Sequence, residues 1–132
     1  MKVYVAGASS ELELVERYIY RLIKEDIVIT HNWCSDIRES FRTTFQRPAL
    51  YLAAQNDVNG VRAADIFWLI IPKKESRGCW VEYGIALVGS LVARQKTIIS
   101  GVVGPKDIFL LMADQHFDEH EQAFEYIVSL AK

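Results

Sequence analysis

The chain is short of several kinds of residue and pattern, and each shortage excludes a class of protein. Its two cysteines, Cys34 and Cys79, are too few for a disulfide framework and form no CxxC motif. No apolar run approaches the ~20 residues of a membrane span, and the N-terminus lacks the pattern of a secretion signal. No basic stripe occurs and the net charge is −2, so a nucleic-acid polymer is not an expected partner. We therefore expect a reduced, cytoplasmic protein that contacts neither membranes nor nucleic acid.

What the sequence does contain indicates one α/β domain over residues 1–132. Hydrophobic residues make up 51% of the chain and charged residues 24%, which is ordinary for a globular domain. Short apolar segments alternate with segments of helical periodicity, which indicates a parallel sheet covered by helices on both faces. We expect a flavodoxin-like or Rossmann-like sandwich of about five strands, at residues 2–6, 27–30, 66–71, 97–100 and 115–117.

Capping and proline signals predict where the helices begin. Ser10 and Glu13 form an S-x-x-E capping box for a helix after the first strand. Pro48 suits the first turn of the next long helix, and Asp118 with Glu121 is predicted to cap the last one. Between the first two helices, residues 31–34 are expected to form a polar-aromatic loop, whereas residues 35–46 suit either a helical turn or a loop.

The stretch from Asn56 to Gly84 contains the features that locate a site. Residues 66–71 form the most apolar run of the chain and predict a strand that is buried on both faces. A charged loop follows, and a new helix that begins near Cys79 carries Glu82. Because ligands bind outside the carboxyl ends of parallel strands, Glu82 lies where an active site is expected.

Two acidic residues of this stretch, Asp57 and Glu82, are the candidate catalytic groups. Two carboxylates at one cleft can cleave a glycosidic bond, one attacking the anomeric carbon and the other handling protons. The sequence leaves alternatives open. Glu82 equally suits a helix N-terminal residue that complements the macrodipole, and Asp57 taken alone suits a solvated position on a helix better than a catalytic one.

Two segments are candidate anion-binding sites. The turn that contains Gly7, Ser9 and Ser10 joins the first strand to a helix, so its backbone N–H groups suit an anion. Ser76 and Gly78 offer a second hydroxyl and N–H cluster at the start of a later helix. In the first of these segments the serines also suit a purely structural capping role.

The histidines and cysteines do not predict a metal centre. His31 and Cys34 share one loop, but a tetrahedral site needs more ligands at defined spacing than these two and Cys79 provide. His116 and His120 are expected to be surface residues. No metal or organic cofactor is predicted.

In combination, four segments resemble the nucleoside 2-deoxyribosyltransferase superfamily, which includes the 2′-deoxynucleoside 5′-monophosphate N-glycosidases. The first is V-Y-V-A-G-A at residues 3–8, and the second is N-D-V-N-G-V at residues 56–61, followed by Asp65. The third is the apolar run at residues 66–71, and the fourth is S-x-G-x-x-x-E-x-G at residues 76–84. These segments occur in the order that the family shows and extend over most of the chain.

The resemblance implies a role for each catalytic candidate. Glu82 would attack C1′ of the sugar and form a glycosyl ester, while Asp57 would protonate or hold the leaving base. Tyr4 would position Glu82 or the sugar, and water or a second base would resolve the ester with retention. The resemblance also implies a homodimer or larger oligomer in which a neighbouring subunit helps to close each site.

Departures from the family pattern bear on the substrate. Ser76 occupies the place where many transferases have an aspartate that grips the 5′-hydroxyl, and a hydroxyl there suits a 5′-phosphate instead. The monophosphate hydrolases have an arginine where this chain has Ser10; Arg77 is a candidate replacement. His31 and Trp33, on either side of Asn32, are candidates for stacking on a base, although this segment also suits a loop that plugs against the core.

The favoured interpretation of the sequence is hydrolysis of a nucleoside 5′-monophosphate. Base exchange on a free deoxynucleoside is the alternative within the same chemistry. A catalytically silent nucleotide-binding module on the same fold is the alternative outside it.

Overall fold

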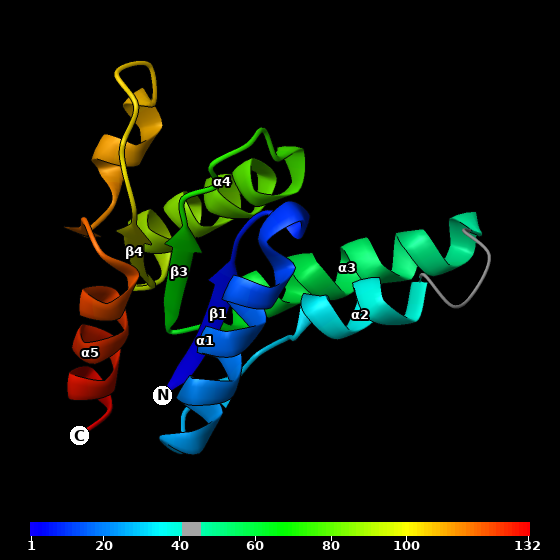
Figure 1. Ribbon diagram of the computed structural model, residues 1–132, viewed down its shortest axis with the longest axis horizontal. Helices are drawn as coiled ribbons and strands as arrows, with labels where there is room; N and C mark the ends of the chain where they lie inside the picture. Colours follow the sequence, from blue (N-terminus) through cyan, green and yellow to red (C-terminus); the bar gives the residue numbers. More distant parts are fainter. Residues whose placement is uncertain (41–45) are drawn as a thin grey trace.

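A computed structural model describes residues 1–40 and 46–132 and shows a parallel five-stranded sheet in the order β2-β1-β3-β4-β5 (Figure 1). All neighbouring strands pair in parallel. The strands are β1 (Lys2–Ala6), β2 (Val28–Ile29), β3 (Ile66–Ile70), β4 (Lys96–Ser100) and β5 (Gln115–Phe117). This is the flavodoxin-like strand order, so the predicted α/β class is confirmed.

Helices cover both faces of the sheet. The α-helices are α1 (Leu12–Lys24), α2 (Trp33–Ser40), α3 (Arg47–Ala63), α4 (Arg77–Val92) and α5 (His120–Ala131), and the short 3-10 helices are η1 (Ser9–Glu11) and η2 (Ile108–Met112). Helices α1 and α5 pack on one face, and α3 and α4 pack on the other (Figure 1). Helix α2 lies against α1 and α3 and extends with α3 beyond the sheet. None of the helices in the described ranges is long and apolar enough to cross a bilayer.

The central strand β3 is buried along its whole length, as its apolar sequence predicts. Its side chains and those of β1 form the middle of the core, where each fully buried large apolar side chain contributes about 1.5–3 kcal/mol. The one polar group of the Trp68 side chain is satisfied there, because its Nε1–H donates to Ser100 Oγ at 2.8 Å. Pro48 lies in the first turn of α3, as predicted.

Two predicted helix caps are wrong. Ser10 caps nothing, because residues 9–11 form η1 and α1 begins only at Leu12 without a side-chain cap. The last helix begins one residue later than expected, with a capping box made by Glu119 and Gln122. Glu121 instead accepts a hydrogen bond from Arg21 of α1 at 2.6 Å, so a tertiary contact takes the side chain that the local pattern assigned to the cap.

The expected loop at residues 31–34 is also partly wrong, because α2 begins at Trp33. The indole of Trp33 is buried and its Nε1–H donates to the Val5 carbonyl oxygen at 2.8 Å, which attaches the start of α2 to β1. The open choice for residues 35–46 resolves into helix up to Ser40, and residues 41–45 lie outside the described part of the chain.

Candidate active site

The candidate site lies at the carboxyl ends of β1 and β3. The chain continues from β1 to β2 on one side of the sheet, whereas β3 and the later strands lie on the other side, so β1 and β3 flank the topological switch point. This is the position at which doubly wound sheets bind ligands. A cleft of about 420 Å³ opens there. It is lined by residues from the turn after β1, from η1, from the loop after β3 and from α2, α3 and α4: Gly7, Ala8, Ser9, Ser10, Trp33, Ile37, Asp57, Lys74, Glu75, Ser76, Arg77, Gly78, Cys79 and Glu82.

Three ionisable side chains converge beside this cleft from three elements: Tyr4 from β1, Asp57 from α3 and Glu82 from α4. Each has a buried oxygen without a hydrogen-bond partner among the described residues, namely Tyr4 Oη, Asp57 Oδ1 and Glu82 Oε2. Buried polar atoms are normally satisfied, because an unpaired one costs about 1–3 kcal/mol. Three such atoms in one place therefore indicate a site built for a ligand rather than for stability.

Gly60 allows α3 to approach β1 closely enough for this arrangement. A Cβ atom at Gly60 would lie 2.7 Å from His31 Cβ and 3.0 Å from the ring of Tyr4. Any side chain here would push α3, and Asp57 one turn earlier, away from β1. The ring of Tyr4 is held on its other side by stacking on Phe67, with 6.0 Å between centroids.

Burial sets the protonation of the three groups. It raises the pKa of Glu82 to about 8, with a further increase from the charge of Asp57. It raises the pKa of Asp57 to about 6, although the charge of His31 lowers this pKa and that of Asp36 raises it. The pKa of Tyr4 is raised by burial and by both carboxylates, so its hydroxyl stays protonated. Between about pH 6 and pH 8 the two carboxyl groups together hold one proton.

The start of α4 offers donors to an anion. Ser76 is the N-cap residue of α4, but its hydroxyl makes no capping hydrogen bond, so it is free to face a ligand. Gly78 and the cationic residues Lys74 and Arg77 line the same cleft. A helix N-terminus with a free hydroxyl and nearby cations suits a phosphate or another anion.

Of the other predicted binding residues, four line the cleft and His31 lies beside it. Gly7, Ser9, Ser10 and Trp33 line the cleft, but two of them also have structural roles. A Cβ atom at Gly7 would lie 2.6 Å from Val15 Cγ2, so Gly7 is required for packing against α1. The indole N–H of Trp33 already donates to Val5, so Trp33 offers only its ring to a ligand.

His31 lies beside the cleft and contacts two carboxylates. Its Nε2 lies 2.7 Å from Asp36 Oδ2 and 3.4 Å from Asp57 Oδ1. Asp36 was missed by the sequence analysis, because nothing in the local pattern distinguishes it from a solvated residue of α2. Its contact with His31 depends on how the chain turns into that helix.

The remaining histidines and cysteines have no place in the cleft except Cys79. His116 is exposed, as expected, but His120 is half-buried and hydrogen bonds to Ser100 Oγ at 2.8 Å, so the surface expectation for His120 is wrong. Cys34 and Cys79 are both free and buried. Cys79 lines the cleft, with its Sγ–H donating to the Ser76 carbonyl oxygen at 3.4 Å.

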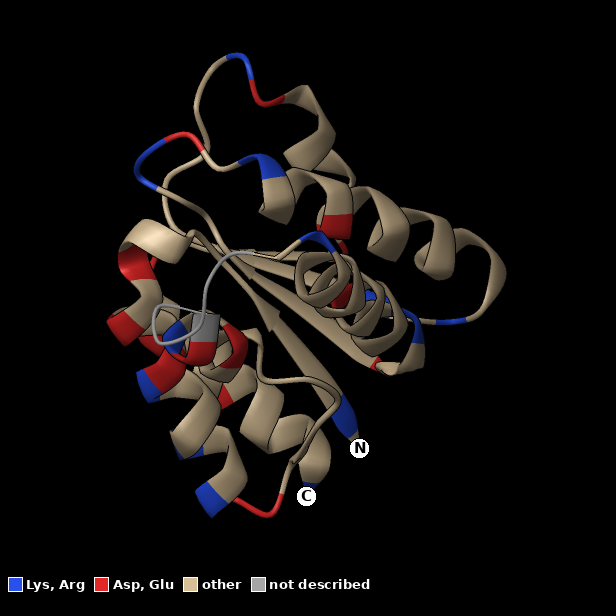
Figure 2. Cartoon of the chain, turned by 90° about the vertical axis from the view of Figure 1, so that its right-hand side faces the viewer, with Lys and Arg blue, Asp and Glu red and all other residues tan. Residues whose placement is uncertain are grey.

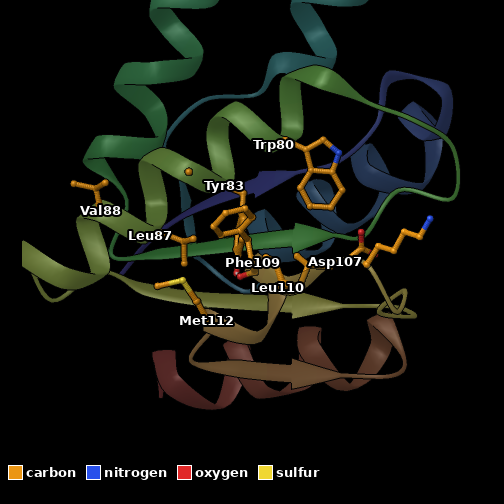
Figure 3. Close-up of a pocket in the computed structure, with 11 residues that line it drawn as sticks. Trp80, Tyr83, Leu87, Val88, Asp107, Phe109, Leu110 and Met112 are labelled. Carbon is orange, nitrogen blue, oxygen red and sulfur yellow. The ribbon is translucent and has the colours of Figure 1, made fainter.

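A second hollow of about 650 Å³ lies between α4 and η2, with apolar side chains pointing into it from both (Figure 3). Trp80, Tyr83, Phe109 and Met112 are among the residues that line it. The hydroxyl of Tyr83 donates to the Phe109 carbonyl oxygen at 2.7 Å and is thereby satisfied. Its described lining is mostly apolar, with Lys106 and Asp107 as the charged residues, whereas two buried carboxyl groups and a buried tyrosine meet beside the cleft at the carboxyl ends of β1 and β3, which is therefore the candidate active site.

Comparison of the chain with protein-family models, with curated proteins and with solved structures finds no match.

Proposed function

We propose that this protein cleaves the N-glycosidic bond of a nucleoside 5′-monophosphate through an ester on Glu82. The observation that carries the proposal is the convergence of Tyr4, Asp57 and Glu82, each with an unpaired buried oxygen, at the β1–β3 crevice. The proposal agrees with the resemblance of the same residues to the nucleoside 2-deoxyribosyltransferase superfamily.

The two carboxyl groups divide the chemistry. The Glu82 carboxylate attacks C1′, the C1′–N bond breaks, and its electron pair leaves with the base, which takes a proton from Asp57. Water then attacks C1′ of the ester, giving one proton to Asp57 and releasing the Glu82 carboxylate, so that the enzyme regains its starting state with net retention. The Tyr4 hydroxyl, which interacts with both carboxyl groups, orients Glu82 towards the sugar.

The single proton that Asp57 and Glu82 share between about pH 6 and pH 8 suits these two roles, one as acid and one as nucleophile. The reactive form has the proton on Asp57 and the charge on Glu82. Since the pKa of Glu82 is raised above that of Asp57, most of the empty protein holds the proton on Glu82 instead. The positive charge that develops on the sugar in the oxocarbenium-like transition state is stabilised by the ionised form of Glu82, so the reaction proceeds through the form that has the proton on Asp57.

The free Ser76 hydroxyl, the N-terminus of α4, and Lys74 and Arg77 favour a 5′-phosphate over a neutral 5′-hydroxyl. One observation favours the second candidate, base exchange on a free deoxynucleoside. Helix η1 places Ser9 and Ser10 in the lining of the cleft and contains no cationic residue, since its one charged residue is the acidic Glu11. If the protein releases no base from either substrate class, the third interpretation holds, which is a catalytically silent nucleotide-binding module.

The deciding experiment incubates the protein with matched nucleosides and 5′-monophosphates and follows free base by chromatography. We expect release from monophosphates, faster than from nucleosides, and a mass adduct of the sugar phosphate on the peptide that contains Glu82. Glu82→Gln should remove both signals, whereas Glu125→Gln on the exposed side of α5 should keep them. Near wild-type turnover by Glu82→Gln would refute the mechanism, and sugar transfer to an added base would favour the transferase.

A further inference from the structure

The strongest unexplained feature near the cleft is a histidine that faces two carboxylates with one nitrogen. His31 Nε2 lies 2.7 Å from Asp36 Oδ2, which is a hydrogen bond, and 3.4 Å from Asp57 Oδ1. A ring nitrogen carries at most one hydrogen, so a Nε2–H that bonds to Asp36 is not available to Asp57 Oδ1. Asp57 Oδ1 is indeed one of the buried oxygens that lack a partner.

The fold fixes the position of each member of this group. Trp33, two residues after His31, is anchored to β1 through its bond to Val5, and Asp36 follows one helical turn later on α2. On the other side, Gly60 lets His31 Cβ lie directly against α3, one turn after Asp57. His31 is therefore held between α2 and α3, within reach of both acids.

The charged and titratable groups around His31 come from three elements. Asp36 faces it from α2, Asp57 from α3, and Tyr4 packs beside Gly60 from β1. The charge of Asp57 in turn acts on Glu82 of α4. The positive charge of His31 favours the ionised form of Asp57, and the negative charge of Asp36 favours its protonated form. His31 and Asp36 thus act on Asp57 in opposite directions.

We infer that Asp36 is a positioning residue of the active site: by holding the N–H of His31, it prevents His31 from pairing with Asp57 and so favours the reactive form, in which Asp57 carries the proton that the leaving base receives. This inference rests on the proposed function for the role of that proton, but not for the arrangement itself. In the absence of Asp36, His31 would turn its N–H to Asp57 and hold that carboxylate ionised.

A bound metal ion is the competing explanation, because the ligand atoms of His31, Asp36 and Asp57 all lie within 4.8 Å of one another. The 2.7 Å contact between Nε2 and Oδ2 is accounted for by a shared hydrogen, and it is shorter than the roughly 3.4 Å that separates two ligands of a tetrahedral zinc. The experiment nevertheless includes calorimetry with Zn²⁺ alone.

The test follows the Asp57 carboxyl by ¹³C NMR across a pH series in the unliganded protein, with its signal assigned from Asp57→Asn. Asp36→Asn should move the midpoint of the Asp57 titration down by about one pH unit, and His31→Gln should move it up. In the His31→Gln background, adding Asp36→Asn should shift the midpoint by less than half as much. The matched control is Asp118→Asn, which removes the acid of the exposed His116–Asp118 pair, separated by 3.8 Å, and should change nothing.

Activity gives the second readout. At pH 7, Asp36→Asn should lower kcat/KM for base release about tenfold or more, with the acidic limb of the pH profile moved in the same direction as the NMR midpoint.

An equal shift from Asp36→Asn with and without His31 would overturn the inference, because Asp36 would then act by charge alone. Zn²⁺ binding that is lost in Asp36→Asn would also overturn it. If the NMR shifts occur but the wild-type protein releases no base from any substrate, the proton arrangement stands and the proposed function fails.

Discussion

At the residue scale, the two carboxyl groups of the cleft have different environments although neither differs in sequence from a surface acid. Glu82 ionises last because it is the more buried and faces Asp57, while Asp57 lies beside His31. Pairs of acids whose surroundings separate their pKa values are the usual basis of acid and base roles. This separation leads to two predictions.

The first prediction concerns the pH dependence of base release. Below about pH 6 both carboxyl groups are protonated and there is no nucleophile, and above about pH 8 both are ionised and there is no acid. The rate should therefore rise and fall around a maximum between these values. Because a phosphate of the substrate also titrates near pH 6, carboxyl ¹³C NMR of the free protein provides the check. A rate that keeps rising to pH 10 would contradict the assignment.

The second prediction concerns stability. The pKa of Glu82 is raised in the folded protein, from an ordinary 4.5 to about 8, so the folded state binds more protons than the unfolded state between these values. The free energy of unfolding must then fall as the pH rises through this range. Glu82→Gln removes the buried charge and should stabilise the protein by about 1–3 kcal/mol at pH 9, and by less at pH 5.

Thermal unfolding of the wild-type protein and Glu82→Gln at pH 5 and pH 9 measures this difference. Glu125→Gln, on an exposed position of α5, is the control for a change of net charge. A Glu82→Gln protein that is less stable at pH 9 than the wild type would mean that ionised Glu82 is satisfied in the fold.

At the scale of elements, α4 carries both the proposed nucleophile and the proposed donors for an anion within its first two turns. Its N-cap residue Ser76 makes no side-chain cap, so the helix does not depend on that hydroxyl. A substitution of Ser76 by Asp can therefore change ligand binding without changing the stability of α4, because Asp is as good an N-cap residue as Ser.

The third prediction uses this substitution. Ser76→Asp should leave the thermal midpoint unchanged or slightly raised, but should lower kcat/KM for monophosphates about tenfold or more through charge repulsion. The matching nucleosides should lose much less. Ser76→Thr, which keeps the hydroxyl, is the control. Equal losses for both substrate classes would show that the phosphate does not lie at the start of α4.

At the scale of the whole molecule, the exposed face of α4 and η2 stands out. No charged residue occurs on α4 after Glu82, and Figure 2 shows the later turns of this helix without Lys, Arg, Asp or Glu. Exposed large apolar residues gather on the two segments, namely Trp80, Val81, Val88, Leu91, Val92, Ile108, Phe109, Leu111 and Met112. A monomer rarely exposes an apolar surface of this extent, which marks an interaction site.

The fourth prediction is that a second copy of the chain covers this surface. Light scattering at micromolar concentration should give the mass of a homodimer or larger oligomer. Val88→Asp combined with Leu111→Asp should give a monomer, since a buried interface does not accept two unpaired charges per subunit. Ile23→Asp, at an exposed apolar position on α1, is the matched control. A monomeric and fully active wild-type protein would contradict the prediction.

The sequence by itself determined those features that depend on local pattern. The apolar run at residues 66–71 gave a fully buried β3, since only a strand covered on both faces needs apolar residues at every position. The alternation of strands and helices gave the parallel sheet, and the position of Glu82 after β3 placed it near the carboxyl end of that strand. The local pattern was not sufficient at the Ser10 and Asp118 caps. Residues 9–11 form η1 ahead of α1, and Glu121 pairs with Arg21 of α1 instead of capping α5.

The tertiary structure alone decided which residues share the site and what state they are in. Strand order follows from how the crossovers pack, and this packing brings Tyr4, Asp57 and Glu82 together across about eighty residues of sequence. Asp36 reaches His31 only because Trp33 is anchored in the core. The raised pKa values arise from burial by several elements at once, and no window of sequence contains that information, because desolvation is a property of everything that surrounds a group.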